Sequence, residues 1–311
     1  MSNTLNNLSI IGVEKSNLLN WYKMMHLIRD FDAEVVNGHK RGEVQIIHSC
    51  AGQEAIATGM CAVLKEDDYA VTNHRPIAHL LAKGADPKKL MAEYLGKLTG
   101  YCGGRVGERM ICSSEINCVA SGMVGGQITI AVGMALAIKF FKKTEQVVLC
   151  FLGEGAAPNG AFHEGLNVSA IYKLPVIFIC ENNGININTP SQEYLSVPSV
   201  ADFAKGYGMK SSIIDGNDLI AVYKAAKESI EWTRSGFGPS FVEAHTFRLG
   251  KHQEGLGDPR PEEEMKRGWA KEPISRFSRK LRETGLMSDR EDSGIRESVA
   301  NEIQDALKYA R

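Results

Sequence analysis

The stretch QVVLCFLGEGAAPNGAFHEGLNVSAIYKLPVIFICENNGININ, residues 146–188, decides the expected fold. Gln146–Leu152 is a short apolar, β-branched run that stops at a glycine, which predicts a buried strand. Asn159 can cap a helix over Ala161–Tyr172, and Leu174–Cys180 is a second apolar run that is too short for a helix. A strand, a crossover helix and a strand form a right-handed βαβ unit, so we expect two parallel strands buried on both faces.

Both expected strands end in polar, glycine-containing sequence, Gly153-Glu154-Gly155-Ala156 and Glu181-Asn182-Asn183-Gly184. Because ligands of open parallel sheets bind at the carboxyl ends of the strands, we expect Glu154 and Asn183 to meet at one point. A carboxylate, an amide oxygen and a nearby main-chain carbonyl, at Ile185, are hard oxygen ligands that suit Mg²⁺ and a phosphate. The alternative is that the glycines form tight βα turns and the polar residues merely cap.

Composition narrows the class of protein. The 311 residues contain 36 Lys and Arg against 37 Asp and Glu, so no basic surplus points to nucleic acid. Seven scattered cysteines lack CxxC or zinc spacing, which favours a reduced, cytoplasmic setting over a disulfide framework. No run reaches the length of a membrane span, and the first residues do not resemble a signal or transit peptide. We expect a cytoplasmic protein with an N-terminal arm over residues 1–15 and one α/β domain over residues 16–311.

Stop signals and periodicity predict further elements along the chain. Leu18–Asn37 reads as a helix that ends at Gly38, and Ser240–Phe247 reads as a third strand of the sheet. The charged segment Gln253–Arg267, which contains glycine and proline, predicts a mobile loop. This loop either orders over a bound ligand or is a solvated connector. Two helices, over residues 273–284 and 293–309, are expected to close the chain.

Three further places favour a ligand site. A turn delivers His48 beside the N-terminus of the helix that follows Gln53, a position suited to holding a carboxylate, although His48 could instead only pack the turn. Arg75 follows a short strand, where a guanidinium can bind phosphate oxygens in a bidentate manner. Glycines around Gly122 let the backbone approach a flat ring closely.

Residues 153–183, GEGAAPNGAFHEGLNVSAIYKLPVIFICENN, resemble the alpha subunit of the thiamine-diphosphate-dependent dehydrogenase component of 2-oxo acid and acetoin dehydrogenase complexes. The resemblance covers roughly residues 20–310. Its motifs are specific because several distant stretches agree in order. It implies an open, mostly parallel sheet flanked by helices, the phosphate-side domain of the thiamine-diphosphate-binding fold. It also implies Mg²⁺ and thiamine diphosphate as cofactors. Glu154 stands where the family has aspartate, a residue shorter by one methylene.

The resemblance assigns expected roles residue by residue. It implies that His48 faces the substrate pocket and that His252 lies near the reaction centre, so both are expected to be catalytic. Residues expected to bind the cofactor are His74, Arg75, Gly122, Val124, Gly153, Glu154, Gly155, Ala156, Asn183, Arg248 and His252. Residues expected to bind the metal are Glu154, Asn183 and Ile185.

The chain departs from the family pattern in two further places. The family's glycine-rich loop ends in Gly-Gly-Ser-Met-His, where this chain reads Val106-Gly107-Glu108-Arg109-Met110. The family usually has a histidine where this chain has Ile77. We therefore expect an altered substrate or acceptor, or reduced activity.

The implied function is that of an alpha subunit that forms an ylid-derived carbanion on thiamine diphosphate and passes an acyl group to a lipoyl carrier. In the family the glutamate that activates the cofactor lies on a separate beta subunit. We therefore expect a beta-subunit partner and an α₂β₂ heterotetramer. A lipoyl acyltransferase is expected as a further partner. Two alternatives are a carboligase that makes an acyloin without a lipoyl partner, and a non-catalytic paralogue that assembles with or regulates a true alpha subunit.

Overall fold

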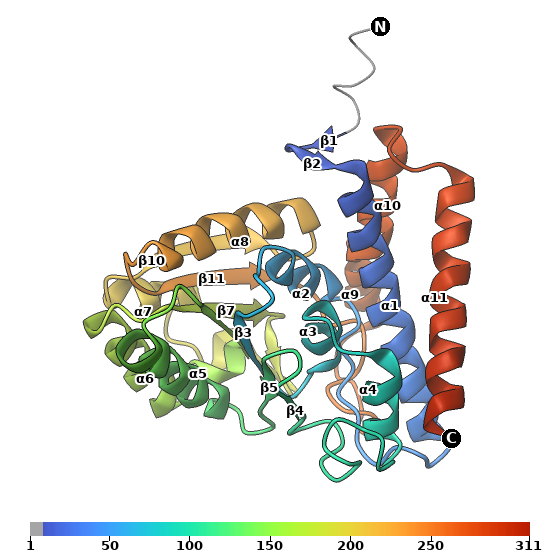
Figure 1. The fold of residues 1–311 in the computed structure, drawn as a ribbon, viewed down its shortest axis with the longest axis horizontal. Helices are drawn as coiled ribbons and strands as arrows, with labels where there is room; N and C mark the ends of the chain where they lie inside the picture. The colour runs from blue at the N-terminus through green and yellow to red at the C-terminus, as the bar shows by residue number, and fades with distance from the viewer. Residues whose placement is uncertain (1–8) are drawn as a thin grey trace, which may run out of the picture.

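A computed structural model describes residues 9–311 and shows a mixed sheet flanked by helices (Figure 1). The seven strands have the order β10-β11-β7-β6-β3-β5-β4, and each pair is parallel except β4 and β5. In this order the strands are Lys210–Asp215, Ser240–His245, Val176–Asn182, Val148–Gly153, Tyr69–Thr72, Cys118–Ala120 and Cys112–Ser113. The expected open, mostly parallel α/β sheet is confirmed.

The central βαβ unit is formed as the sequence predicts. Strand β6 pairs with β7 from Val148 opposite Val176 to Gly153 opposite Glu181. Helix α6 (Gly160–Ile171) joins them and is capped by Asn159, whose side chain accepts a hydrogen bond from the Ala161 N–H at 2.9 Å. Because both strands end at the same edge in this register, Glu154 and Asn183 emerge side by side.

Helices cover both faces of the sheet. The alternate residues Val148, Cys150 and Leu152 of β6 pack with α5 (Gly126–Leu136), α6 and α7 (Val200–Gly206) in one apolar cluster. Leu149 and Phe151 point to the other face, toward α2 (Glu54–Cys61), α3 (Ile77–Ala82) and α8 (Leu219–Arg234). This alternation buries β6 on both faces, as expected for a central strand of a parallel sheet.

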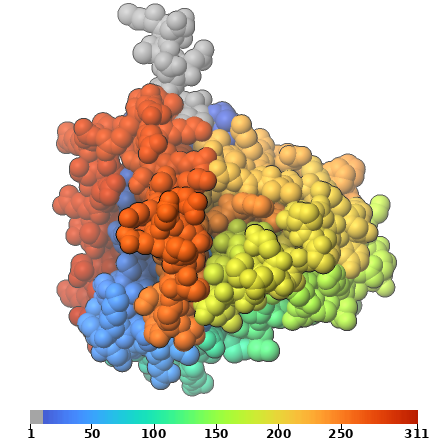
Figure 2. Space-filling model, turned by 180° about the vertical axis from the view of Figure 1, so that it is seen from behind, coloured from blue at the N-terminus to red at the C-terminus, as the bar shows by residue number. Residues whose placement is uncertain are grey.

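A group of long helices lies beside the sheet, at the right of Figure 1. It contains α1 (Lys15–Lys40), α10 (Pro273–Glu283) and α11 (Asp289–Ala310), with the shorter α4 (Pro87–Tyr94) packed against α11. Seen from behind, the C-terminal helices lie against α1, so the first and last helices close the same side of the molecule (Figure 2). None of the helices within residues 9–311 is long and apolar enough to cross a membrane.

Short elements complete the described chain. Two small antiparallel pairs are β1 (Ser9–Ile10) with β2 (Val13–Glu14), and β8 (Ile185–Asn186) with β9 (Thr189–Pro190). Helix α9 spans Glu262–Trp269, and single turns of other helix types lie at Ala137–Lys142, Glu154–Ala156 and Ser191–Glu193.

The structure corrects three expected boundaries. Helix α1 does not end at Gly38 but continues to Lys40, and the chain turns at Gly42, whose φ is +78°. Part of the segment expected to be a mobile loop, residues 262–267, is instead the first part of α9. Of the expected N-terminal arm, residues 1–8 lie outside the described chain, and residues 9–14 form the β1–β2 hairpin.

Candidate active site

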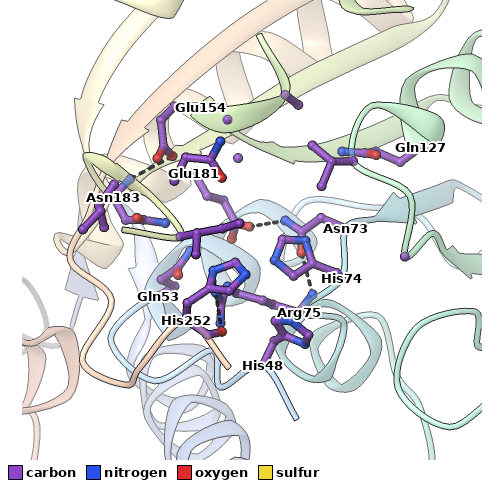
Figure 3. Close-up of a pocket in the computed structure, with 18 of the residues that line it drawn as sticks. His48, Gln53, Asn73, His74, Arg75, Gln127, Glu154, Glu181, Asn183 and His252 are labelled. Carbon is purple, nitrogen blue, oxygen red and sulfur yellow. Dashed lines mark hydrogen bonds between the residues drawn. The ribbon is translucent and has the colours of Figure 1, made fainter. Parts of the chain in front are cut away.

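A cavity of about 180 Å³ lies at the carboxyl ends of β3, β6 and β7 (Figure 3). The chain leaves β3 toward one edge of the sheet and β6 toward the other, so the cavity lies at the switch point of the sheet, where open α/β sheets bind ligands. The lining residues are His48, Gln53, Asn73, His74, Arg75, Arg109, Gly122, Val124, Gln127, Gly153, Glu154, Gly155, Ala156, Glu181, Asn183, Ile185, Asn186, Ile187 and His252.

The metal ligands expected from the sequence lie together at one end of this cavity. Glu154 is 2% exposed and its Oε2 accepts a hydrogen bond from the main-chain N–H of Asn183 at 3.3 Å. Its other oxygen accepts a hydrogen bond from the Tyr194 hydroxyl at 3.2 Å. Ile185 lines the same end of the cavity. The two strand ends therefore do converge, as the βαβ unit predicted.

The chemistry of these groups fits a hard divalent cation. The side-chain oxygen Oδ1 of Asn183 is buried and has no hydrogen-bond partner within residues 9–311. Burial raises the pKa of Glu154, so a carboxylate here is incompletely compensated by its neighbours. An orphaned amide oxygen beside such a carboxylate is the donor set that a bound Mg²⁺ would satisfy.

Arg248 is the most conspicuous uncompensated group near the site. Its side chain is 1% exposed, and none of its three guanidinium nitrogens has a hydrogen-bond partner in the described chain. Burial, together with Arg75 and Arg260, lowers the pKa of Arg248 to about 9. Arg248 is not among the residues that line the cavity, although it acts electrostatically on Glu154. A buried, unpaired guanidinium is costly unless an anion compensates it, which fits a diphosphate.

Arg75 is positioned differently from the simple phosphate ligand that the sequence suggested. One terminal nitrogen donates to the Ser49 carbonyl at 2.6 Å, and the other donates to the His252 carbonyl at 2.9 Å. The side chain is 5% exposed. Arg75 therefore joins the segments that carry His48 and His252 while still lining the cavity.

Three histidines converge at the end of the cavity opposite Glu154. The ring centroid of His48 lies 5.0 Å from that of His74 and 5.2 Å from that of His252. Burial, followed by the neighbouring Arg75, lowers the pKa of His48 and of His252 to about 3, and it also lowers the pKa of His74 well below its ordinary value. All three rings are therefore neutral near pH 7, and each can donate one hydrogen bond.

Glu108 is a site residue that the sequence did not identify. Its carboxyl group is 4% exposed and contacts His48 twice, through the main-chain N–H at 2.6 Å and through Nδ1 at 2.8 Å. Burial raises the pKa of Glu108 to about 8. A protonated Glu108 donates to Nδ1, which leaves the N–H of His48 on Nε2. In the sequence, only the departure of this loop from the family pattern pointed to Glu108, and that departure did not show that Glu108 contacts His48.

The glycine-containing segments form the remaining walls. Gly122 and Val124 line the cavity beyond the end of β5, and Val124 is 50% exposed. Gly153, Gly155 and Ala156 line it after β6, and a Cβ at residue 155 would lie 2.9 Å from the side chain of Asn186. Close approach of backbone to neighbouring groups therefore requires a glycine at this turn.

A buried polar network forms part of the cavity wall. Glu181, the residue that ends the apolar run of β7, accepts hydrogen bonds from Asn73 at 2.8 Å and shares one with His79 Nε2 at 3.0 Å. The sequence rule that pointed to Asn183 could also have identified Glu181. Ile77, by contrast, is 1% exposed and packs in the apolar core on the face covered by α2, α3 and α8, and it is not a cavity residue.

The chain is similar to known proteins over most of its length. The family described as dehydrogenase E1 component matches residues 22–311. The alpha subunit of acetoin:2,6-dichlorophenolindophenol oxidoreductase from Bacillus subtilis (strain 168) is 43% identical over 236 residues, which is 75% of this chain and 71% of that protein. The alpha subunit of the same name from Cupriavidus necator is 35% identical over 313 residues, which is 97% of this chain and 91% of that protein.

A branched-chain enzyme is similar over a comparable length. The 2-oxoisovalerate dehydrogenase subunit alpha of Bacillus subtilis (strain 168) is 33% identical over 305 residues, which is 96% of this chain and 92% of that protein. These matches confirm the family resemblance carried by residues 153–183. The chain belongs to the dehydrogenase E1 component family, in which it is an alpha-type subunit of the thiamine-diphosphate-dependent 2-oxo acid and acetoin dehydrogenases.

Proposed function

We propose that this chain binds the diphosphate end of thiamine diphosphate together with Mg²⁺ and works with a beta subunit as a 2-oxo acid or acetoin dehydrogenase. The observation that carries the proposal is that Glu154 and Asn183 line the same cavity, and that the buried Oδ1 of Asn183 has no hydrogen-bond partner within residues 9–311. Glu154, Asn183 and the main-chain carbonyl of Ile185 would hold the metal. The extra methylene of Glu154, compared with aspartate, does not move the carboxylate out of this cavity.

Arg248 and His74 would compensate the diphosphate. Both carry buried nitrogens without partners in the described chain, and phosphate oxygens accept hydrogen bonds from such donors. Arg75, which lines the cavity, would add to the positive potential. The neutral His252, whose Nδ1 lies 3.3 Å from a guanidinium nitrogen of Arg75, would add one hydrogen-bond donor. The main-chain groups of Gly153, Gly155 and Ala156 would border the diphosphate end of the cofactor.

The substrate would bind at the end of the cavity opposite Glu154, where His48, His74 and His252 converge, here called the histidine end. Thiamine diphosphate supplies, when bound, the nucleophilic carbon and the electron sink for cleavage next to a carbonyl. His48 and His252 would orient the carbonyl and hold a proton near it, because both are neutral and face the cavity. Gly122 and Val124 would contact the pyrimidine ring through main-chain groups.

A beta subunit would complete the site. Val124 is 50% exposed and its neighbour Met123 is 70% exposed, so the cavity wall near Gly122 continues into an apolar surface. Relatives of this chain are named alpha subunits, which supports a partner of the beta type. We propose an α₂β₂ heterotetramer in which the beta chain supplies the glutamate that activates the cofactor.

Calorimetric titration of the α–β complex with thiamine diphosphate tests the site. We expect binding that requires Mg²⁺ and that Glu154→Gln weakens at least about tenfold, since it removes the charged metal ligand. Glu193→Gln is the matched control, because Glu193 is exposed and lies outside the cavity. Binding that is independent of Mg²⁺, or equal weakening by both substitutions, would contradict the proposal.

The acceptor is tested separately. We propose transfer of the acyl group to the lipoyl group of an acyltransferase, as expected for a member of this family. Mixed alpha and beta chains should acylate a lipoyl domain and reduce an artificial dye, and neither chain alone should do so. Acyloin formation without lipoyl acylation would favour a carboligase, and cofactor binding without any turnover would favour a non-catalytic subunit.

A further inference from the structure

Arg109 carries a positive charge at the cavity and is not among the residues assigned to the diphosphate. Its side chain is exposed, lines the cavity and packs across Gly122, where a Cβ would lie 2.7 Å from the Arg109 Cβ. Within residues 9–311 its guanidinium forms neither an ion pair nor a hydrogen bond by the usual distance criteria. An unpaired guanidinium at the mouth of a cavity is available to a ligand.

The loop that carries Arg109 is held in place by a buried carboxylate. Glu93 is fully buried, and its two oxygens accept hydrogen bonds from four main-chain N–H groups between residues 102 and 107, at distances of 2.7, 2.9, 3.1 and 3.3 Å. Four such bonds order the backbone immediately before Glu108 and Arg109. The position of Arg109 beside the cavity is therefore built into the fold.

The neighbouring acid does not neutralise Arg109. Glu108 turns inward to His48, where burial raises its pKa to about 8, so the group is mostly protonated at pH 7. Arg75 is buried and donates to the carbonyl groups of Ser49 and His252. Among the charged groups that residues 9–311 place at the histidine end, Arg109 is thus the cation whose donors have no partner in that part of the chain.

A simple 2-oxo acid has one carboxylate, and the hydrogen-bond donors of His48 and His252 already face the place where it would bind. We propose that Arg109 recognises a second anionic group, so that the substrate is a 2-oxo acid with another carboxylate, or a similar anion, away from its carbonyl. This inference rests on the proposed function, because it names the substrate class of that site. A charge-assisted hydrogen bond of this kind is expected to change relative affinity by about tenfold to a hundredfold.

Matched substrate pairs test the proposal on the α–β complex with thiamine diphosphate and Mg²⁺. Each pair has a 2-oxo diacid and the 2-oxo monoacid of equal chain length, such as 2-oxoglutarate with 2-oxopentanoate and 2-oxoadipate with 2-oxohexanoate. For the wild type, we expect kcat/KM to favour one of the diacids. Arg109→Met should lower the ratio of diacid to monoacid by about tenfold to a hundredfold. Arg105→Met is the matched control, since Arg105 is exposed on the same loop but does not line the cavity.

Calorimetry gives a second measurement that does not need turnover. Glutarate and adipate, which carry two carboxylates, should bind the complex more tightly than pentanoate and hexanoate, and Arg109→Met should remove the difference. A wild-type preference for the monoacids or acetoin, or an equal effect of Arg109→Met on both members of a pair, would overturn the inference. If the complex binds no thiamine diphosphate, the proposed function fails, and the binding of the dicarboxylates still decides the role of Arg109.

Discussion

Glu108 Oε2 lies 2.8 Å from Nδ1 of His48, although the two residues are 60 positions apart in the sequence. The same carboxyl group also accepts the main-chain N–H of His48 at 2.6 Å. This double contact fixes both the orientation of the imidazole ring and which of its nitrogens carries the proton. The loop that departs most from the family pattern is therefore joined directly to a residue expected to act on the substrate.

Replacing Glu108 with Gln should alter the pH dependence of stability. The folded-state pKa of Glu108 is about 8 against an ordinary value of 4.5, so its contribution is fully present below about pH 4.5 and is lost as the pH rises through about 8. Wild type should therefore lose stability relative to Glu108→Gln by at most about 1.4 kcal/mol per pH unit across this window. Urea unfolding at several pH values measures it, with Glu193→Gln as a control. Parallel curves for wild type and Glu108→Gln would refute the raised pKa.

Replacing Arg248 with Met should stabilise the protein in the absence of cofactor. The guanidinium is buried and has no partner among the residues that the structure describes, so an apolar side chain of similar length should raise the free energy of unfolding by about 1–3 kcal/mol. The same substitution should abolish the stabilisation that thiamine diphosphate and Mg²⁺ give to the wild type. Thermal and urea unfolding, with and without both ligands, measure the two effects.

Arg234→Met is the contrast for that experiment. Arg234 forms two hydrogen bonds to the fully buried Asp68, at 3.0 and 2.6 Å. Its loss leaves the buried carboxylate with main-chain N–H donors but without a counter-charge. We expect destabilisation of about 3–5 kcal/mol from the same chemical change. If both arginine substitutions shifted stability in the same direction, the assignment of Arg248 as an uncompensated charge would be wrong.

A pair of glycines tests how strongly the loop beside the cavity is held. Gly104 and Gly107 both have positive φ, +69° and +56°, so an alanine at either position is strained by about 1–2 kcal/mol. A Cβ at residue 104 would also lie 2.3 Å from the carbonyl carbon of Gly96, whereas one at residue 107 would have no neighbour within 4 Å. Gly104→Ala should therefore reduce stability and diacid turnover more than Gly107→Ala. Equal effects, by unfolding and kinetics, would argue against a fixed loop.

Cofactor binding should protect the segment between Arg248 and α9. Arg260 ties this segment back through hydrogen bonds to the carbonyl groups of Arg248, at 2.5 Å, and of Gly250, at 2.7 Å. Because Arg248 and His252 are expected to bind the diphosphate, thiamine diphosphate and Mg²⁺ should slow tryptic cleavage at the exposed Lys251. Cleavage at the exposed Lys143, far along the chain from this segment, serves as the control. Unchanged cleavage at Lys251 would count against ordering by the cofactor.

The sequence alone was sufficient for the central unit and the family. The apolar runs of β6 and β7, the Asn159 cap and the polar residues at the strand ends are local patterns, and a parallel βαβ unit allows few arrangements. The sequence therefore predicts that Glu154 and Asn183 meet.

Tertiary structure decided the features that depend on distant contacts. The link between Glu108 and His48, the free charge of Arg109 and the burial of Arg248 arise from loop packing that has no sequence period. Helix α1 continues past Gly38 because a single glycine weakens a helix by only about 1 kcal/mol, which the packing of its buried residues offsets. Local preferences thus set the sheet and its strand ends, while the folded chain decided which charges meet at the site.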